Sequence, residues 1–73
     1  MDNYHINIFC SIEDEGFIAD IPDLKFCNAF GETPEKALAE VLTAQKLWVE
    51  SAKETNRMIP KPKYKPIIYK IAQ

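Results

Sequence analysis

Carboxylates are the most abundant reactive groups in this sequence. Metal-dependent nucleases use clusters of such groups, and the acids that could form one here are Glu13, Asp14, Asp20, Asp23 and Glu32. A metal cluster requires acids that project from strands at fixed positions, whereas residues 13–15 fall in a predicted turn, where charge is ordinarily solvated. Only Asp20 falls inside a predicted strand. We therefore expect no metal site, and a metal-dependent nuclease stays an alternative.

Nucleophilic catalysis would require Ser or Cys beside a base, and His5 is the only histidine. Nothing in the sequence ties it to an orienting acid, so we interpret His5 as a surface or subunit-contact residue. Cys10 and Cys27 lack the further ligands of a structural zinc site, and we expect both to be reduced core residues. Gly16 and Gly31 are the only glycines, which excludes a Gly-rich phosphate loop. We expect neither enzyme activity nor a cofactor.

Length and composition indicate one small domain spanning 1–73. The chain has 73 residues, 47% of them hydrophobic, and a formal charge of −2. A core this small rarely supplies more than about 3–5 kcal/mol of net stability, so we expect self-association, at least into a dimer. No apolar run is long enough to span a bilayer and no signal peptide opens the chain, which predicts a cytoplasmic protein without membrane contact.

The net charge conceals a strong asymmetry along the chain. All eleven acids fall within residues 1–56, against four lysines, which gives that segment a charge of −7. The last seventeen residues carry five cations and no acid. Because stacking aromatics are not interleaved with these cations, they do not amount to a nucleic-acid footprint, and direct nucleic-acid binding is not expected.

Three strands are predicted in the first half of the chain. Residues 4–12 alternate with period 2, and we expect their apolar set to face inward: Tyr4, Ile6, Ile8, Cys10 and Ile12. A polar turn with Gly16 free to take positive φ leads into a second strand over 16–21, and a third covers 25–30. Strands joined by short connections form an antiparallel meander.

A long helix is predicted over 34–55. Thr33 can cap it, and Pro34 fits the first helical position, where no donor is needed. Apolar residues then recur at helical spacing, so one face of the helix must cover the sheet. The band of Leu47, Trp48 and Val49 is wider than one stripe, and Trp48 is interpreted either as core or as a partner anchor.

The prolines at 60, 62 and 66 favour an extended connector after the helix. Alternation then predicts a short strand over 67–72. The predicted fold class is therefore α+β, with the order β-β-β-α-β: a three-stranded antiparallel meander covered by one long helix, with a short C-terminal strand.

Two motifs in sequence order resemble the HicB-like antitoxin family of prokaryotic type II toxin–antitoxin systems. The first runs from Ile18 to Leu24 and continues to Cys27; the second runs from Phe30 to Leu38. The resemblance covers roughly residues 4 to 60. Its motif positions, which we expect to be structural, are Asp20, Pro22, Leu24, Cys27, Gly31, Thr33, Pro34 and Ala37. Family members usually have Pro-Gly where this chain has Lys25-Phe26, and Glu where it has Lys36.

The resemblance implies a degenerate, RNase H-like fold without nuclease activity that occludes a HicA-type, RNA-cleaving toxin. A carboxylate-rich surface suits a cationic RNA-binding partner, and apolar anchors would supply affinity. The residues expected to contact the partner are Glu13, Asp14, Glu15, Phe26 and Trp48. Besides the nuclease, the alternative is a structural homo-oligomer with no toxin partner.

Overall fold

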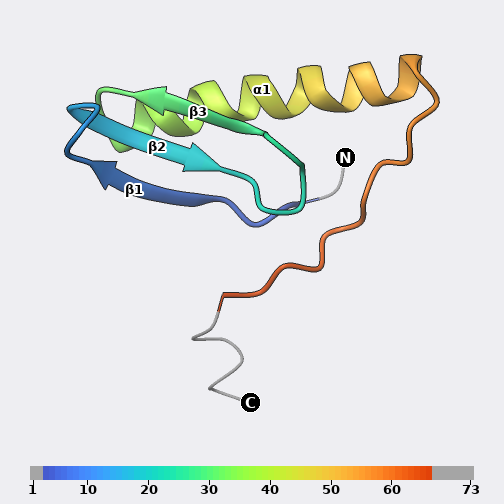
Figure 1. Cartoon of the computed structure of the whole chain (residues 1–73), viewed down its shortest axis with the longest axis horizontal. Helices are drawn as coiled ribbons and strands as arrows, with labels where there is room; N and C mark the ends of the chain where they lie inside the picture. Colours follow the sequence, from blue (N-terminus) through green and yellow to red (C-terminus); the bar gives the residue numbers. More distant parts are fainter. Residues whose placement is uncertain (1–2, 67–73) are drawn as a thin grey trace.

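A computed structural model describes residues 3–66 of the chain. Its elements follow the order β1 (Asn7–Ser11), β2 (Gly16–Asp20), β3 (Asn28–Gly31) and α1 (Pro34–Glu54). The strands form one antiparallel sheet in the order β1-β2-β3, and α1 lies along one side of it (Figure 1). The predicted α+β class and three-stranded meander are confirmed. The strand predicted over 67–72 lies outside the described residues.

The helix forms where its capping signals predict. The Thr33 hydroxyl accepts a hydrogen bond from the Lys36 amide at 3.1 Å, and Pro34 occupies the first turn. At the other end Asn56 adopts a left-handed φ of 56°, and the Arg57 amide donates to the Ala52 carbonyl at 2.8 Å. One stripe of the helix is buried: Ala37, Val41, Gln45, Val49 and Ala52. That spacing places them all on the face toward the sheet.

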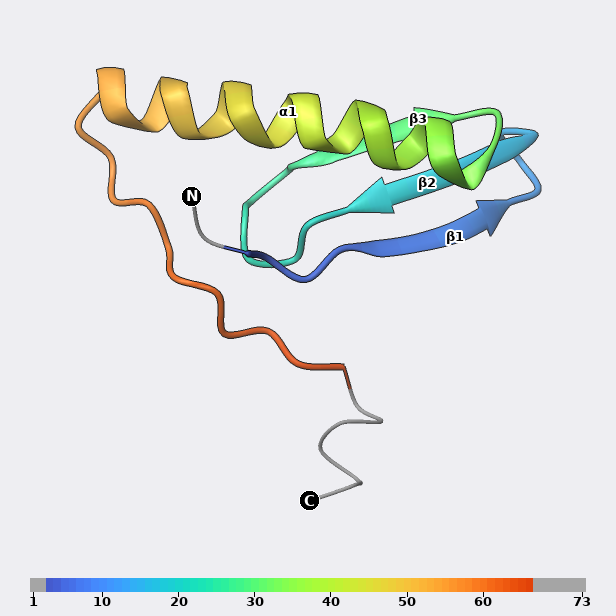
Figure 2. The same ribbon diagram turned by 180° about the vertical axis from the view of Figure 1, so that it is seen from behind.

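The core lies between α1 and the near side of β2 and β3. Its buried residues are Tyr4, Ala19, Ile21, Leu24, Cys27, Ala37 and Val41, with Phe17, Ala29 and Trp48 among the residues packed against them. Seen from behind, α1 runs alongside β3, and β1 lies at the far edge of the sheet (Figure 2). The helix accordingly packs chiefly on β3 and β2 and touches β1 least.

This offset overturns part of the prediction for the first strand. Tyr4 is buried and Ile6 packs against the core, but Ile8, Cys10 and Ile12 are exposed. Ile8 pairs with the fully buried Ala19 and therefore shares its face of the sheet, yet the helix does not extend over it. The prediction of a reduced core cysteine is thus wrong for Cys10, although both cysteines are free.

All three strands are shorter than predicted. β1 begins at Asn7, opposite Asp20, since β2 stops before Pro22, which has no amide hydrogen to donate. β3 begins at Asn28 rather than residue 25, because Phe26 adopts a left-handed φ of 61° that no strand contains. The residues ahead of β3 belong to a closed loop.

The segment after the helix is an extended connector, as its prolines predict. Residues 57–66 contain no helix or strand and run back past the N-terminal segment (Figure 1). The Tyr4 hydroxyl donates to the Pro60 carbonyl, and the amides of Lys63 and Tyr64 donate to Asp23 Oδ2 at 3.2 and 3.1 Å. The tail is therefore tied to the first residues of the chain and to the loop after β2.

Candidate functional site

The acidic turn, residues 13–15, joins β1 to β2 and is fully exposed. The Glu15 amide donates to the Ile12 carbonyl at 3.2 Å, and the Ser11 hydroxyl donates to Asp14 Oδ2 at 2.7 Å. Positive φ falls on Glu15, at 55°, and not on Gly16, so the prediction of a left-handed glycine here is wrong. The turn presents three carboxylates to solvent from a closed backbone.

Gly16 and Gly31 are required for close approach, not for turn conformation. Neither has a positive φ. A Cβ added to Gly31 would overlap the backbone of Lys36 and Ala37, so this glycine lets the first turn of α1 lie directly against β3. A Cβ added to Gly16 would overlap the ring of Phe30, which therefore lies over Gly16. Gly31, a motif position expected to be structural, therefore has a packing role.

The 21–27 loop connects β2 to β3 and carries Phe26. The Ile21 amide donates to the Cys27 carbonyl at 3.0 Å, and the Cys27 amide donates to the Leu24 carbonyl at 3.1 Å. Leu24 and Cys27 are buried beneath it, whereas Phe26 is 89% exposed. A large aromatic side chain is thus held in a strained conformation, on a closed loop, almost entirely in water.

Trp48 supports this loop from the helix. Its indole Nε1–H donates to the Lys25 carbonyl at 3.0 Å, and the Arg57 guanidinium carbon lies 5.4 Å from the centroid of its ring. The ring is half-buried against the core, while Leu47 is 60% exposed and Val49 is buried. Trp48 is placed to position Phe26 rather than to anchor a partner by itself.

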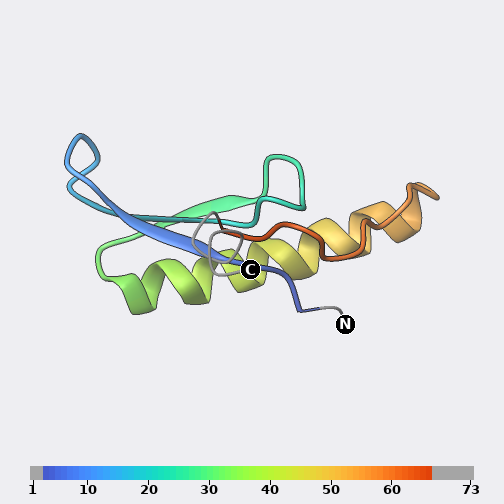
Figure 3. The same ribbon diagram turned by 90° about the horizontal axis from the view of Figure 1, so that it is seen from below.

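The predicted partner-contact residues do not form one cluster. The acidic turn follows the last residue of β1, and the 21–27 loop follows the last residue of β2, so the two lie at opposite ends of the sheet. Figure 3 shows the sheet nearly edge-on, with α1 on one side and both the turn and the loop rising on the other. Glu13, Asp14 and Glu15 therefore border the uncovered side from one end and Phe26 borders it from the other.

An apolar row crosses the uncovered side between these two segments. Phe9 pairs with Ile18, and Ile18 pairs with Phe30, so the three side chains stand in register on adjacent strands. Their neighbours in the next row, Ala19 and Ala29, face the helix, which places the row on the opposite face. Phe9 is 51% exposed and Phe30 is 43% exposed.

Sequence reasoning missed this row because its three members lie far apart in the chain. Phe9 shares its strand face with His5, Asn7 and Ser11, which reads as the polar side of the strand. Only the register of the two strand pairs shows that Phe9 meets another apolar residue. Alternation within the second and third predicted strands was the available signal, but it fixes no register.

The acids considered as metal ligands do not converge. Within residues 3–66, no group of three or more His, Cys, Asp or Glu side chains is arranged to hold a metal ion. Asp20 ends β2, in register with Asn7 and Asn28. Asp23 instead holds the C-terminal connector through two backbone amides. Of the two, only Asp20 faces the same side of the sheet as the apolar row.

His5 contacts neighbours within its own chain. Its Nε2 lies 2.7 Å from Asn7 Oδ1, and its ring centroid is 4.9 Å from that of Tyr64. No carboxylate is its hydrogen-bond partner in these contacts; Asn7 orients the ring and Tyr64 packs on it. His5 therefore helps to attach the connector to the start of β1.

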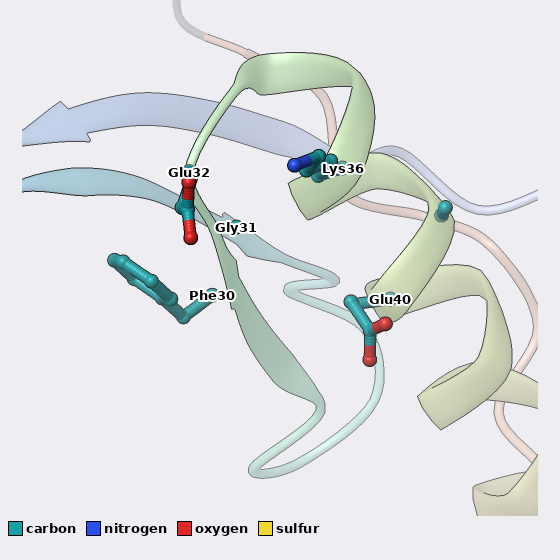
Figure 4. Close-up of a pocket in the computed structure, with 6 residues that line it drawn as sticks. Phe30, Gly31, Glu32, Lys36 and Glu40 are labelled. Carbon is teal, nitrogen blue, oxygen red and sulfur yellow. The ribbon is translucent and has the colours of Figure 1, made fainter.

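A small pocket lies between the end of β3 and the first turns of α1. It encloses about 290 Å³ and is lined by Phe30, Gly31, Glu32, Lys36, Ala39 and Glu40 (Figure 4). Ligand pockets usually measure about 300–1,000 Å³ and are mostly enclosed by apolar groups. Three of the six lining residues here are charged, namely Glu32, Lys36 and Glu40, and the Phe30 ring points away from the helix.

The motif positions of the sequence have structural roles. Leu24, Cys27 and Ala37 are core residues, and burial raises the pKa of the Cys27 thiol. Thr33 and Pro34 start the helix, and Gly31 admits it to the sheet. Pro22 directly follows the loop's first residue, Ile21, whose amide closes the loop. Leu24 and Cys27 thus fill the core beneath the 21–27 loop, and Gly31, Thr33 and Pro34 fix the entry to α1.

Comparison with known proteins finds one clear sequence relationship. Over 58 residues the chain is 43% identical to the UPF0150 protein ssl0259 of Synechocystis sp., which covers 80% of this chain and 78% of that protein. No protein-family model matches the chain. No solved structure gives a significant match. Among the described residues, no helix has the length and apolar character needed to cross a membrane.

Proposed function

Because this chain belongs to the UPF0150 family, we propose that it is a HicB-like antitoxin, a non-enzymatic protein that binds and neutralises a HicA-type, RNA-cleaving toxin. The observation that carries the proposal is Phe26, which is 89% exposed and held at a φ of 61°. Strain of this kind persists only where the surrounding structure enforces it, and it concentrates at functional positions. A protein-binding role explains why the fold presents this ring to solvent.

Rigidity of the loop strengthens that interpretation. The indole of Trp48 holds the Lys25 carbonyl at 3.0 Å, and backbone hydrogen bonds close the loop on both sides of Phe26. An anchor whose conformation is fixed before binding loses little entropy when it enters a pocket of a partner. Aromatic side chains in that situation are the usual energetic centres of protein interfaces.

The electrostatics favour a cationic partner. The acidic turn presents Glu13, Asp14 and Glu15 without an intervening cation, and all three are exposed. Carboxylates in this setting raise the rate of association with a basic protein and disfavour acidic ones. An RNA-cleaving toxin must itself carry a basic surface to bind the phosphate backbone.

Co-expression tests the proposal. The chain is produced together with the small protein encoded by the neighbouring reading frame, and growth and co-purification are measured. We expect the chain to relieve growth arrest and to form a complex that weakens as salt rises. Phe26→Ser should reduce rescue, and the matched control Leu47→Ser, which alters an exposed apolar residue of α1, should not. Absence of both complex and rescue at low salt would refute the proposal.

A further inference from the structure

We propose that the partner docks on the uncovered face of the sheet, over the row of Phe9, Ile18 and Phe30, with a surface that is apolar at its centre and cationic toward the acidic turn. This inference rests on the proposed function and identifies the surface through which the chain would bind its partner. It makes the sheet, and not α1, the element that meets the partner.

Strand register and the position of α1 keep the row at the surface. Register places its three members side by side across all three strands, and Phe30 packs over Gly16, the one position in β2 without a side chain. The opposite face already carries α1, so no element among the described residues covers the row. Phe9 and Phe30 are exposed and Ile18 between them is partly exposed. A row of large apolar side chains that reaches solvent on one face of a sheet is typical of an interaction site.

Both candidate segments from the sequence border this same face. The acidic turn rises at one end of it and the 21–27 loop with Phe26 at the other (Figure 3). A partner seated on the apolar row would therefore reach carboxylates in one direction and the Phe26 loop in the other. This arrangement explains how residues at opposite ends of the molecule can serve one interface.

The charges around this face favour a cationic partner. The three strands contain one charged residue, Asp20, and no Lys or Arg. Asp20 stands in register with Asn7 and Asn28 beside the apolar row. Of the two bordering segments, the acidic turn adds three carboxylates, whereas the 21–27 loop adds one acid, Asp23, and one base, Lys25, so the border is anionic overall. The face is thus apolar with an anionic border, which complements a cationic protein surface. An acidic partner would meet like charge without compensation.

Affinity measurements on paired variants test the docking face. The full chain is titrated calorimetrically with the purified product of the neighbouring reading frame. Phe9→Thr removes the apolar group from the row, and Ile8→Thr makes the matched change on the other face of the same strand. We expect Phe9→Thr to weaken binding about 30-fold and Ile8→Thr about twofold at most. Circular dichroism verifies that both variants fold.

A second pair of variants tests the charge. Glu13→Lys is expected to weaken binding about tenfold at low salt, and the difference should shrink as salt rises. Glu50→Lys makes the same change on an exposed position of α1 and should leave the affinity unchanged. Equal losses for the two variants would show a general effect of net charge and would count against docking on this face.

Nuclear magnetic resonance gives a readout that needs no substitution. In the wild-type chain the Ile18 methyl resonances should shift on addition of the partner, while those of Val41, buried on the core-facing side of α1, should stay in place. If the wild type binds but Phe9→Thr binds equally well and Ile18 does not shift, the docking face is wrong and the antitoxin proposal stands. If the wild type does not bind at low salt, both fail.

Self-association provides the remaining contrary outcome. Sedimentation of wild type and Phe9→Thr shows whether the row joins two copies of the chain. A change from dimer to monomer with unchanged affinity for the partner would assign the face to a second copy and overturn the proposal.

Discussion

In the middle of the sheet the two faces differ in the size of their side chains, in the opposite sense to a simple rule of burying the largest groups. Toward α1 the middle of β2 and β3 presents Ala19 and Ala29, and the only large side chain of β2 on that face, Phe17, stands at the strand's start in register with Gly31. Toward solvent the strands present Phe9, Ile18 and Phe30. Close approach of the helix requires small groups on the covered face, because larger ones would hold the two layers apart.

The two faces separate the residues that stabilise the fold from those available to bind a partner. Bulk in the core comes from the ends of the strands and the loop, through Ile21 and Leu24, rather than from the middle of the sheet. The middle of the uncovered face is left free to carry large side chains for a partner. Substitutions made in pairs, one on each face, test this division.

The largest contrast is expected between two isoleucines of the same segment. Ile21→Ala should lower the free energy of unfolding by about 4 kcal/mol, since the side chain is fully buried and its loss leaves a cavity. Ile18→Ala, on the uncovered face, should cost about 1 kcal/mol. Urea denaturation measures both. Equal losses would mean that the uncovered face is buried in solution.

The two glycines provide the next contrast. Gly31→Ala forces a Cβ into the backbone of α1, which cannot yield locally, and should destabilise the fold by about 3 kcal/mol. Gly16→Ala meets mainly the ring of Phe30, which can rotate away, although the Gly31 carbonyl oxygen would be 2.8 Å from the new group. We expect a loss of about 1 kcal/mol there. Thermal unfolding measures both losses, and a larger loss for Gly16→Ala than for Gly31→Ala would contradict this expectation.

Substitution of Phe26 is expected to raise the free energy of unfolding, in contrast to the substitutions above. Phe26→Gly relieves a left-handed conformation that costs a bulky residue about 1 kcal/mol and sacrifices little burial, so a net stabilisation of about 0.5 kcal/mol is expected. The same variant should lose rescue in co-expression. Stability and binding would then respond in opposite directions to one change. A destabilised Phe26→Gly would mean that the ring packs within its own chain.

The smallest expected effect is the pH dependence of stability that arises from the buried cysteine, Cys27. Burial raises the pKa of the Cys27 thiol above its ordinary 9.0, so the folded state holds the proton more tightly than the unfolded state does. The resulting stability is fully present below pH 9 and declines as pH rises beyond it. Urea denaturation of wild type and Cys27→Ala across pH 8 to 10.5 should show this slope in the wild type alone. Cys10→Ala, at the exposed position, should keep it.

Local signals predicted the elements well and their faces less well. The capping residue Thr33 and the apolar spacing of the helix depend on near neighbours only, and α1 matches its prediction to within one residue. For β1, alternation correctly divided the strand into two faces, but which part of a face is covered depends on where α1 lies. Ile8 and Cys10 therefore point to the helix side and are still exposed.

For the candidate site, the sequence identified Glu13, Asp14, Glu15, Phe26 and Trp48 but not how they are arranged. The strained φ of Phe26 had a signal, because the HicB-like family that the motifs resemble usually has Gly there, yet the exposed ring and the supporting indole of Trp48 depend on the tertiary structure. The row through Phe9 required two strand registers at once, which no single segment encodes.

The sequence by itself determined the order of elements, the limits of the helix and the acidic turn, because propensity, capping and turn chemistry act between residues close in the chain. The tertiary structure alone shows which face of the sheet is covered, and that Gly31 and Gly16 allow the close approach of α1 and of the Phe30 ring. It also shows that the acidic turn and the 21–27 loop border one surface. These features depend on strand register and on the offset of α1 toward β3, which are set by packing between segments distant in sequence.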